Sequence, residues 1–225
     1  MRERSLKTEL LEELSSVISG RTFDALLPPL VFVLLNGILG LDIAVLGAVM
    51  VALFFSLLRI RRKQNWWYAA AGLLGVILAS LVAYLTRSAG SYFIPAILSS
   101  ALLLLLVLLS LLSDKPLAAW TSHLVRGWPL GWFWRKDIKP AYREVTLVWG
   151  ALIFIRLVIQ VLLYRSGDPV IQAWANILLG WPVIIAVLVL SYLYGTWRLR
   201  RLGGPGVDEY KEAKKPPWIG QTRGF

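Results

Sequence analysis

Residues 92–112 read YFIPAILSSALLLLLVLLSLL, a run without a single charged side chain. At about 1.5 Å per residue, a helix of roughly 20 residues crosses the ~30 Å hydrocarbon core of a bilayer. Working outward from this run, further apolar stretches of similar length lie at residues 22–40, 43–59, 66–85, 145–164 and 171–195. The sequence therefore predicts an all-α polytopic membrane helix bundle with six transmembrane helices.

The composition excludes two common classes of protein. Hydrophobic residues make up 57% of the chain and charged residues 16%, whereas a soluble domain carries about 25% charged residues. This excludes an ordinary water-soluble globule, and the high hydrophobicity excludes disorder. The chain has no cysteine and one histidine, His123. Because no nucleophile–base pair or group of metal ligands is visible, we expect neither an enzyme nor a bound metal or cofactor.

Lys and Arg are distributed unevenly along the chain. Of these 24 residues, 21 lie in four alternate segments: the N-terminus, the loop after the second span, the loop 113–144 and the C-terminal tail. The positive-inside rule then places both termini in the cytoplasm. Since the net charge of +11 reflects topology, we expect no nucleic-acid partner. The expected partners are the lipid bilayer and either another membrane protein or a second copy of the chain.

The chain divides into three parts. Residues 1–20 predict a cytoplasmic amphipathic helix, because apolar residues recur at helical spacing away from Glu9, Glu12 and Glu13. This helix would either lie on the membrane face or dock a partner. Residues 21–198 are the six-span membrane domain, which includes the cytoplasmic loop 113–144. Residues 199–225 contain glycines, prolines and mixed charge, and predict a flexible basic cytoplasmic tail.

The loop 113–144 carries a short helix of its own. Asp114 can cap it, Pro116 suits its first turn and Gly127 can end it. We expect it to lie in the membrane plane, followed by tryptophans beside basic residues, as in an interfacial anchor. The loop is either a plain anchor or a platform for lipid or a partner, with these candidate residues: Leu117, Trp120, Leu124, Trp128, Trp132, Trp134, Arg135 and Lys136.

Polar residues inside the spans mark a second candidate site. Arg156 lies near the middle of the fifth span, where a charge costs about 2.5–3.5 kcal/mol on insertion scales. It is interpreted either as an anion or proton site or as a structural cation. Polar amides near it form either a solute pocket or hydrogen bonds between helices. The candidate intramembrane site comprises Arg156, Gln160, Tyr164, Asn176, Asn36 and Asp24.

Asp24 and three prolines lie in the first and sixth predicted spans, where they affect the charge and the regularity of the helices. Asp24 is a candidate counter-ion for Arg156, although the depths of the two residues do not obviously match. Pro28 and Pro29 follow it, so the first span is either a longer, kinked helix or an irregular one. In the sixth span, Pro182 follows Gly180 and predicts a bend.

Several short runs resemble one family of bacterial polytopic membrane proteins, the domain-of-unknown-function 3159 family. The likeness covers about residues 19–200. The family also looks distantly similar to intracellular septation protein A. The resemblance implies an all-helical bundle in the bacterial plasma membrane and no settled activity. The runs that carry it are FDALLPPLVF at 23–32, FIP at 93–95, GWFWR at 131–135, RLVIQ at 156–160 and LGWP at 179–182.

Two functions are compatible with these features. The first is a small solute or ion transporter or channel, with a polar intramembrane site around Arg156. The alternative is a non-catalytic membrane scaffold, an assembly factor or a subunit of an envelope, division or other membrane complex. The scaffold would use the amphipathic N-terminus and the tryptophan-rich loop, and it rests partly on the family analogy.

Overall fold

The computed structural model describes residues 21–63 and 65–225, and their side chains except for residues 21–25 and 181. Helices and no strands make up the secondary structure of this described part. The all-α prediction is therefore confirmed there. The amphipathic helix predicted within residues 1–20 lies outside the described residues.

Five helical stretches of the described chain are long and apolar enough to cross a membrane. They coincide with five of the six predicted spans. The first predicted span, 22–40, corresponds to helix α2 (Arg21–Leu39), which runs through both prolines and has a shorter apolar part, Leu26–Leu39. Six crossings with both termini on one side therefore stay a prediction. The five long stretches are α3 (Leu41–Arg61), α4 (Trp66–Thr86), the 3-10 helix η1 (Ala89–Phe93) with α5 (Ile94–Leu112), α8 (Lys139–Ser166), and α9 (Pro169–Leu178) with α10 (Trp181–Leu202).

The described chain forms two compact units, each built from separate stretches of sequence. The first contains the described residues up to Ser99 and Leu157–Ile185, and the second contains Ser100–Arg156 and Ala186–Phe225. Long helices such as α8 run from one unit into the other. This division was not predicted, because the sequence presents residues 21–198 as one series of spans.

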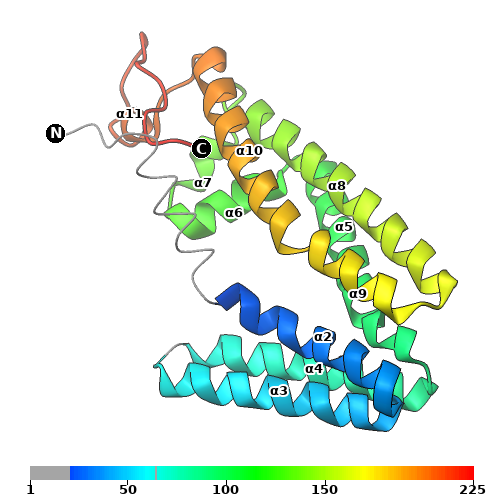
Figure 1. Ribbon diagram of the computed structural model, residues 1–225. Coiled ribbons are helices and arrows are strands. Elements are labelled where there is room, and N and C mark those ends of the chain that lie inside the picture. Colours follow the sequence, from blue (N-terminus) through cyan, green and yellow to red (C-terminus); the bar gives the residue numbers. More distant parts are fainter. Residues whose placement is uncertain (1–20, 64) are drawn as a thin grey trace. The chain divides into compact units, whose positions relative to one another are not determined.

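Small residues hold the first unit together. In α3 the buried positions are Ala44, Ala48, Ala52 and Ser56, one on each successive turn, so α2, α3 and α4 can lie close side by side (Figure 1). The Ser56 hydroxyl donates to the Ala69 carbonyl of α4 at 3.2 Å. The Phe32 ring of α2 stacks on Tyr92 of η1 with centroids 4.1 Å apart. Close helix packing and aromatic stacking thus form the core of this unit.

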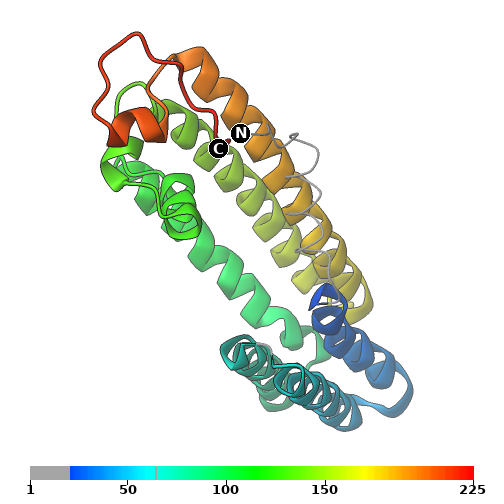
Figure 2. The ribbon, with the colours of Figure 1, turned by 90° about the vertical axis from the view of Figure 1, so that its left-hand side faces the viewer.

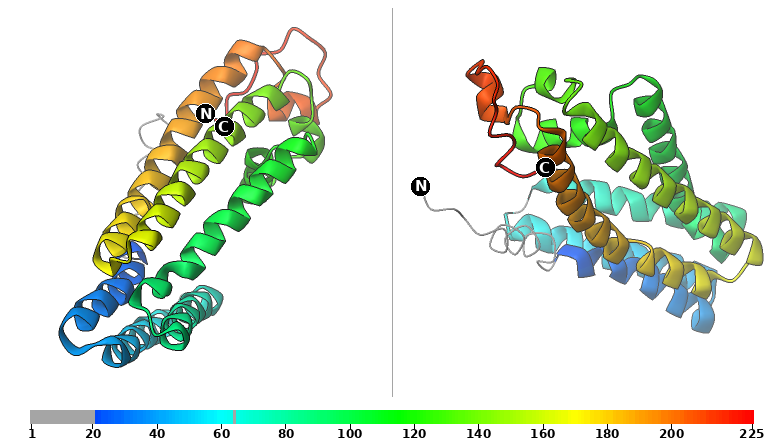
Figure 3. Two further views of the ribbon diagram at one scale, coloured as in Figure 1. Left: turned by 90° about the vertical axis from the view of Figure 1, so that its right-hand side faces the viewer. Right: turned by 90° about the horizontal axis from the view of Figure 1, so that it is seen from above.

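In the second unit, polar contacts join α8 to α10, which lie side by side (Figure 3, left). The indole nitrogen of Trp149 donates to the Ser191 hydroxyl at 2.8 Å. Near the start of α8, the Glu144 carboxylate accepts two hydrogen bonds from the Arg198 guanidinium, both 2.8 Å long, and a third from the Tyr194 hydroxyl at 2.7 Å. Gly150 of α8 faces Val107 of α5 so closely that a Cβ would lie 3.0 Å from it.

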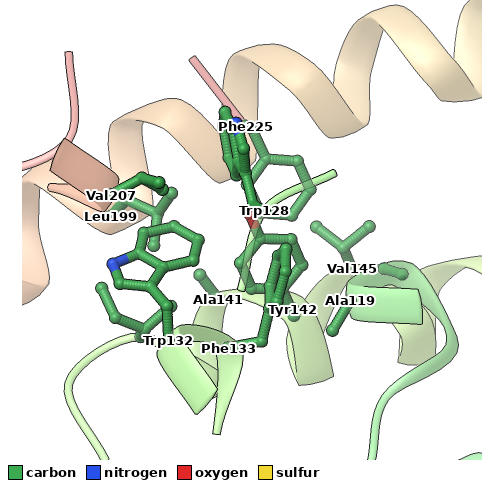
Figure 4. Close-up of a cluster of buried hydrophobic side chains, with 12 residues drawn as sticks. Ala119, Trp128, Trp132, Phe133, Ala141, Tyr142, Val145, Leu199, Val207 and Phe225 are labelled. Atoms are coloured by element: carbon green, nitrogen blue, oxygen red, sulfur yellow. The ribbon is translucent and has the colours of Figure 1, made fainter. Parts of the chain in front are cut away.

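One end of the second unit is closed by an aromatic cluster. It is built from the segment between α5 and α8, which holds α6 (Leu117–Arg126) and α7 (Leu130–Phe133), and from the tail, which holds α11 (Val207–Lys211); Figure 2 shows both at this end of α8 and α10. The buried side chains meet face to face and edge to face (Figure 4). We call this group the cap cluster. Its buried members are Ala118, Ala119, Trp128, Trp132, Phe133, Ile138, Ala141, Tyr142, Val145, Leu199, Val207 and Phe225.

The C-terminal tail differs from the flexible segment that the sequence predicts. The Glu209 carboxylate accepts hydrogen bonds from the backbone N–H groups of Gly206, Ile219 and Gly220, at 2.8, 2.8 and 3.1 Å. At Gly206 a Cβ would lie 2.5 Å from the Gly220 carbonyl oxygen. The missing side chain of Gly206 thus lets two loop segments pack with their backbones close together. Glycine serves here to allow close packing, and it does not make the segment mobile. The composition could not distinguish these two uses of glycine.

Candidate functional site

A break divides the last predicted span into α9 and α10. At about 1.5 Å per residue, the 10-residue α9 is roughly 15 Å long, half the thickness of a bilayer core. Asp168 caps its start, accepting from the backbone N–H of Val170 at 2.8 Å. At Gly180 a Cβ would lie 2.6 Å from the Asn176 carbonyl oxygen. The sequence predicts a bend at Pro182. The structure has a full break two residues earlier, and Pro182 stands in the first turn of α10, where proline is tolerated.

Three amide side chains lie along α9 and the facing part of α8, all in the first unit, and one of them, Asn176, is one turn before this break. The Gln160 amide of α8 donates to the Asn176 side-chain oxygen of α9 at 2.7 Å. Asn176 in turn donates to the Gln172 carbonyl at 2.9 Å, and the Gln172 amide donates to the Leu163 carbonyl at 3.1 Å. The structure thus brings Gln160 and Asn176 into direct contact. We call Gln160, Gln172 and Asn176 the amide network.

The amide network has unused acceptors. Gln160 is 3% exposed and Gln172 is 2% exposed, yet the side-chain oxygen of each has no hydrogen-bond partner within the described chain. Buried polar atoms are nearly always paired, since an unmade hydrogen bond costs about 1–3 kcal/mol. Two buried acceptors of this kind can accept hydrogen bonds from a solute or from water.

Arg156 lies one turn before Gln160 in α8. Its side chain is half-buried, and its Nε has no hydrogen-bond partner in the described part of the chain. No ion pair to Arg156 occurs among the described side chains. The side chain of Asp24, the candidate counter-ion, lies outside those described. Because a cation at membrane depth needs a compensating partner, Arg156 is suited to attract an anion.

Two other predicted members of the site do not join the network. Tyr164 is 37% exposed, and Asn36 is half-buried in α2. None of the hydrogen bonds between described side chains links either residue to Gln160, Gln172 or Asn176. A shared helical face on α8 therefore did not suffice to join Tyr164 to the hydrogen bonds of the amides.

The predicted surface in the loop 113–144 is corrected in its central part. Trp132 is fully buried and Trp128 is 5% exposed, so neither can contribute to a lipid or partner surface. The Trp132 indole donates to the Pro205 carbonyl of the tail at 2.8 Å, which satisfies its polar atom inside the cap cluster. The spacing of these tryptophans beside basic residues predicts an interfacial anchor. The prediction fails for Trp128 and Trp132 because residues of the tail pack against them.

The rest of that surface is mixed. Trp120, Leu124 and Lys136 are exposed, whereas Leu117 and Trp134 are half-buried. Arg135 is also half-buried and donates to both carboxylate oxygens of Asp137, at 2.9 and 2.7 Å. Its guanidinium carbon lies 5.2 Å from the centre of the Trp218 ring. Arg135 is therefore occupied in holding the loop and the tail together.

Sequence reasoning missed the charged group formed by Glu144, Arg198 and Tyr194. A signal was present, because Glu144 directly precedes the fifth predicted span and Arg198 follows the sixth, which places both at the same membrane face under the predicted topology. The pair lies in helices α8 and α10, 54 positions apart in the sequence. The charges of this group compensate each other, whereas Arg156 has no ion pair among the described side chains.

Apolar helices that enclose polar side chains define a helical, membrane-embedded protein. Within that class, the model of a family described as protein of unknown function (DUF3159) matches residues 19–201, and the chain belongs to this family. No curated protein and no solved structure gives a match. The similarity to intracellular septation protein A therefore stays a prediction.

Proposed function

We propose that this protein is a small transporter or channel of the bacterial plasma membrane, and that it conducts an anionic solute or ion past the polar face of α8. The observation that carries the proposal is the amide network, which reaches to within one turn of the α9–α10 break, with its two buried and unused acceptors. Discontinuous helices at mid-membrane depth are a common construction for transporter sites. The guanidinium of Arg156, which has no ion pair among the described side chains, favours negative charge.

The proposal predicts that Arg156 controls ion flux. The purified full chain is reconstituted into liposomes, and chloride and potassium movements are followed with ion-selective electrodes. We expect the wild-type protein to release chloride faster than protein-free liposomes do, and Arg156→Gln to lower that rate by about tenfold or more, because the anion loses its attracting charge. Arg165→Gln, which removes an exposed arginine from the end of the same helix, is the matched control and leaves the rate unchanged.

Two results would count against the proposal. Wild-type chloride flux in the Arg156 variant removes Arg156 from the path, and the absence of any flux above protein-free liposomes removes the ion path itself. A third variant, Gln160→Leu, separates a conducting site from a structural contact. If it lowers the melting temperature and leaves flux intact, the amide network serves only to join α8 to α9.

The alternative function, a membrane scaffold or subunit, is favoured by one surface. Leu124 and Val125 in α6 are 78% and 84% exposed, and they lie on a helix whose Ala118 and Ala119 are buried in the cap cluster. A scaffold copurifies with a stoichiometric companion in mild detergent, which a mass determination of the particle detects. Leu124→Glu with Val125→Glu should release that companion, whereas Ile219→Glu, at the 88% exposed Ile219 of the tail, should not.

A further inference from the structure

We infer that the loop between α3 and α4 binds the headgroup of an anionic phospholipid. The loop joins two helices that are each long and apolar enough to cross a membrane, so it lies at a membrane face. Its binding surface consists of three cations and three aromatic residues, which we call the basic–aromatic loop: Arg61, Arg62, Lys63, Trp66, Trp67 and Tyr68. It is separate from the loop 113–144, where the sequence predicted a lipid surface.

The charge of this loop is uncompensated by its neighbours in the sequence. Arg61, Arg62 and Lys63 are all exposed, and no ion pair between described residues includes them. No Asp or Glu occurs between Asp42 and Asp114, so α4 and α5 supply no carboxylate, and α3 supplies Asp42 alone, in its first turn, where it pairs with Arg87 at 3.0 Å. Clustered cations next to membrane helices attract anionic lipids, because the surface of an anionic membrane carries a negative potential.

The aromatic residues complete an exposed surface at the start of α4. Asn65 caps α4, accepting from the Trp67 backbone N–H at 3.1 Å, which places all three aromatic residues in the first turn. They are 55%, 65% and 73% exposed, in sequence order, and the two indole rings stack with centroids 3.9 Å apart. Consecutive helical residues point about 100° apart, so three of them cannot pack on one neighbouring helix. They form a collar at headgroup depth, where Trp and Tyr are enriched.

The test measures lipid binding to the full chain by native mass spectrometry in mild detergent. Phosphatidylglycerol is titrated into the wild-type protein, with phosphatidylcholine as the neutral comparison. We expect phosphatidylglycerol to bind in preference to phosphatidylcholine. The triple variant Arg61→Gln, Arg62→Gln, Lys63→Gln should bind phosphatidylglycerol about tenfold more weakly or worse. Trp66→Ala with Trp67→Ala should weaken both lipids, because it removes the collar and not the charge.

The matched control removes three exposed cations from the second unit, outside the loop 113–144: Arg200→Gln, Lys211→Gln and Lys215→Gln. It should bind phosphatidylglycerol as the wild-type protein does. An equal loss in both triple variants overturns the inference, since binding would then follow net charge alone. Unchanged binding in the loop variant also overturns it.

Discussion

Two charged side chains of α8, Glu144 and Arg156, differ in whether the described chain supplies a partner for their charge. Glu144 accepts three hydrogen bonds from Arg198 and Tyr194, so its charge is compensated within the chain. Arg156, further along the same helix, has an Nε without a partner among the described residues. The first arrangement joins two helices. At Arg156 the guanidinium can bind an anion, because no described side chain forms an ion pair with it. The proposed transport site therefore centres on Arg156.

At the residue scale, Gly195 controls whether the tail can close the cap cluster. The Phe225 ring stacks on Tyr142 with centroids 4.3 Å apart, and a Cβ at Gly195 would lie 2.1 Å from the ring carbon Cδ2. Gly195→Ala should therefore displace Phe225 and destabilise the protein by about 1–3 kcal/mol, as overpacking does. Thermal unfolding in detergent measures the change.

The matched control for Gly195→Ala is Gly75→Ala in α4. A Cβ there meets nothing within 4 Å, and alanine is the better helix former, so the melting temperature should stay the same or rise. Equal effects at the two positions would contradict the close seating of Phe225.

At the scale of elements, the tail folds around one carboxylate. Three backbone N–H groups donate to Glu209 and hold its pKa below the ordinary value of 4.5. Because the folded pKa is lowered, this carboxylate stabilises the tail fully above its unfolded pKa, and that stabilisation is lost as pH falls through the folded value. The tail should therefore stay closed at neutral pH and loosen in acid, below about pH 4.

A spin label can report this release, since the chain contains no cysteine and Thr222→Cys introduces one at an exposed position. Label mobility should rise on acidification from pH 7 to pH 3. Glu209→Gln should give a mobile label already at pH 7 and no acid step. Glu212→Gln removes an exposed carboxylate that pairs with Lys214 and should leave the titration as in the wild-type chain. A step that survives in Glu209→Gln would assign the release to another group.

At the scale of the whole molecule, the first helix decides how many times the chain crosses the membrane. The apolar part of α2, Leu26–Leu39, is shorter than the other candidate spans. If α2 crosses, the distribution of Lys and Arg predicts both termini on the cytoplasmic side. Single cysteines labelled in intact cells with a membrane-impermeant maleimide test this.

We expect Ser88→Cys and Ser166→Cys, at exposed positions of the two poorly charged loops, to react with the maleimide. Ser5→Cys and Lys215→Cys should be protected until the membrane is permeabilised. Labelling of Ser5→Cys in intact cells, with Lys215→Cys still protected, would show five crossings and an N-terminus outside.

The sequence by itself determined the membrane class and the positions of the long helices, because a helix in lipid must satisfy its own backbone and cover itself with apolar side chains. Both requirements are local, so residues 92–112 predict a span without any knowledge of their neighbours. The chain's membership of its family is likewise carried by runs of adjacent residues.

The tertiary structure alone decided which polar and aromatic residues meet. Gln160 pairs with Asn176 while Tyr164, on the same face of α8, is exposed. Trp132 is buried because the Pro205 carbonyl, 73 positions away in the sequence, receives its indole N–H. Such contacts depend on which segments come together in space, and hydropathy and helical spacing describe one segment at a time. The helices can therefore be predicted from the sequence. The amide network and the packing of the tail on the cap cluster cannot, because they depend on contacts between distant segments.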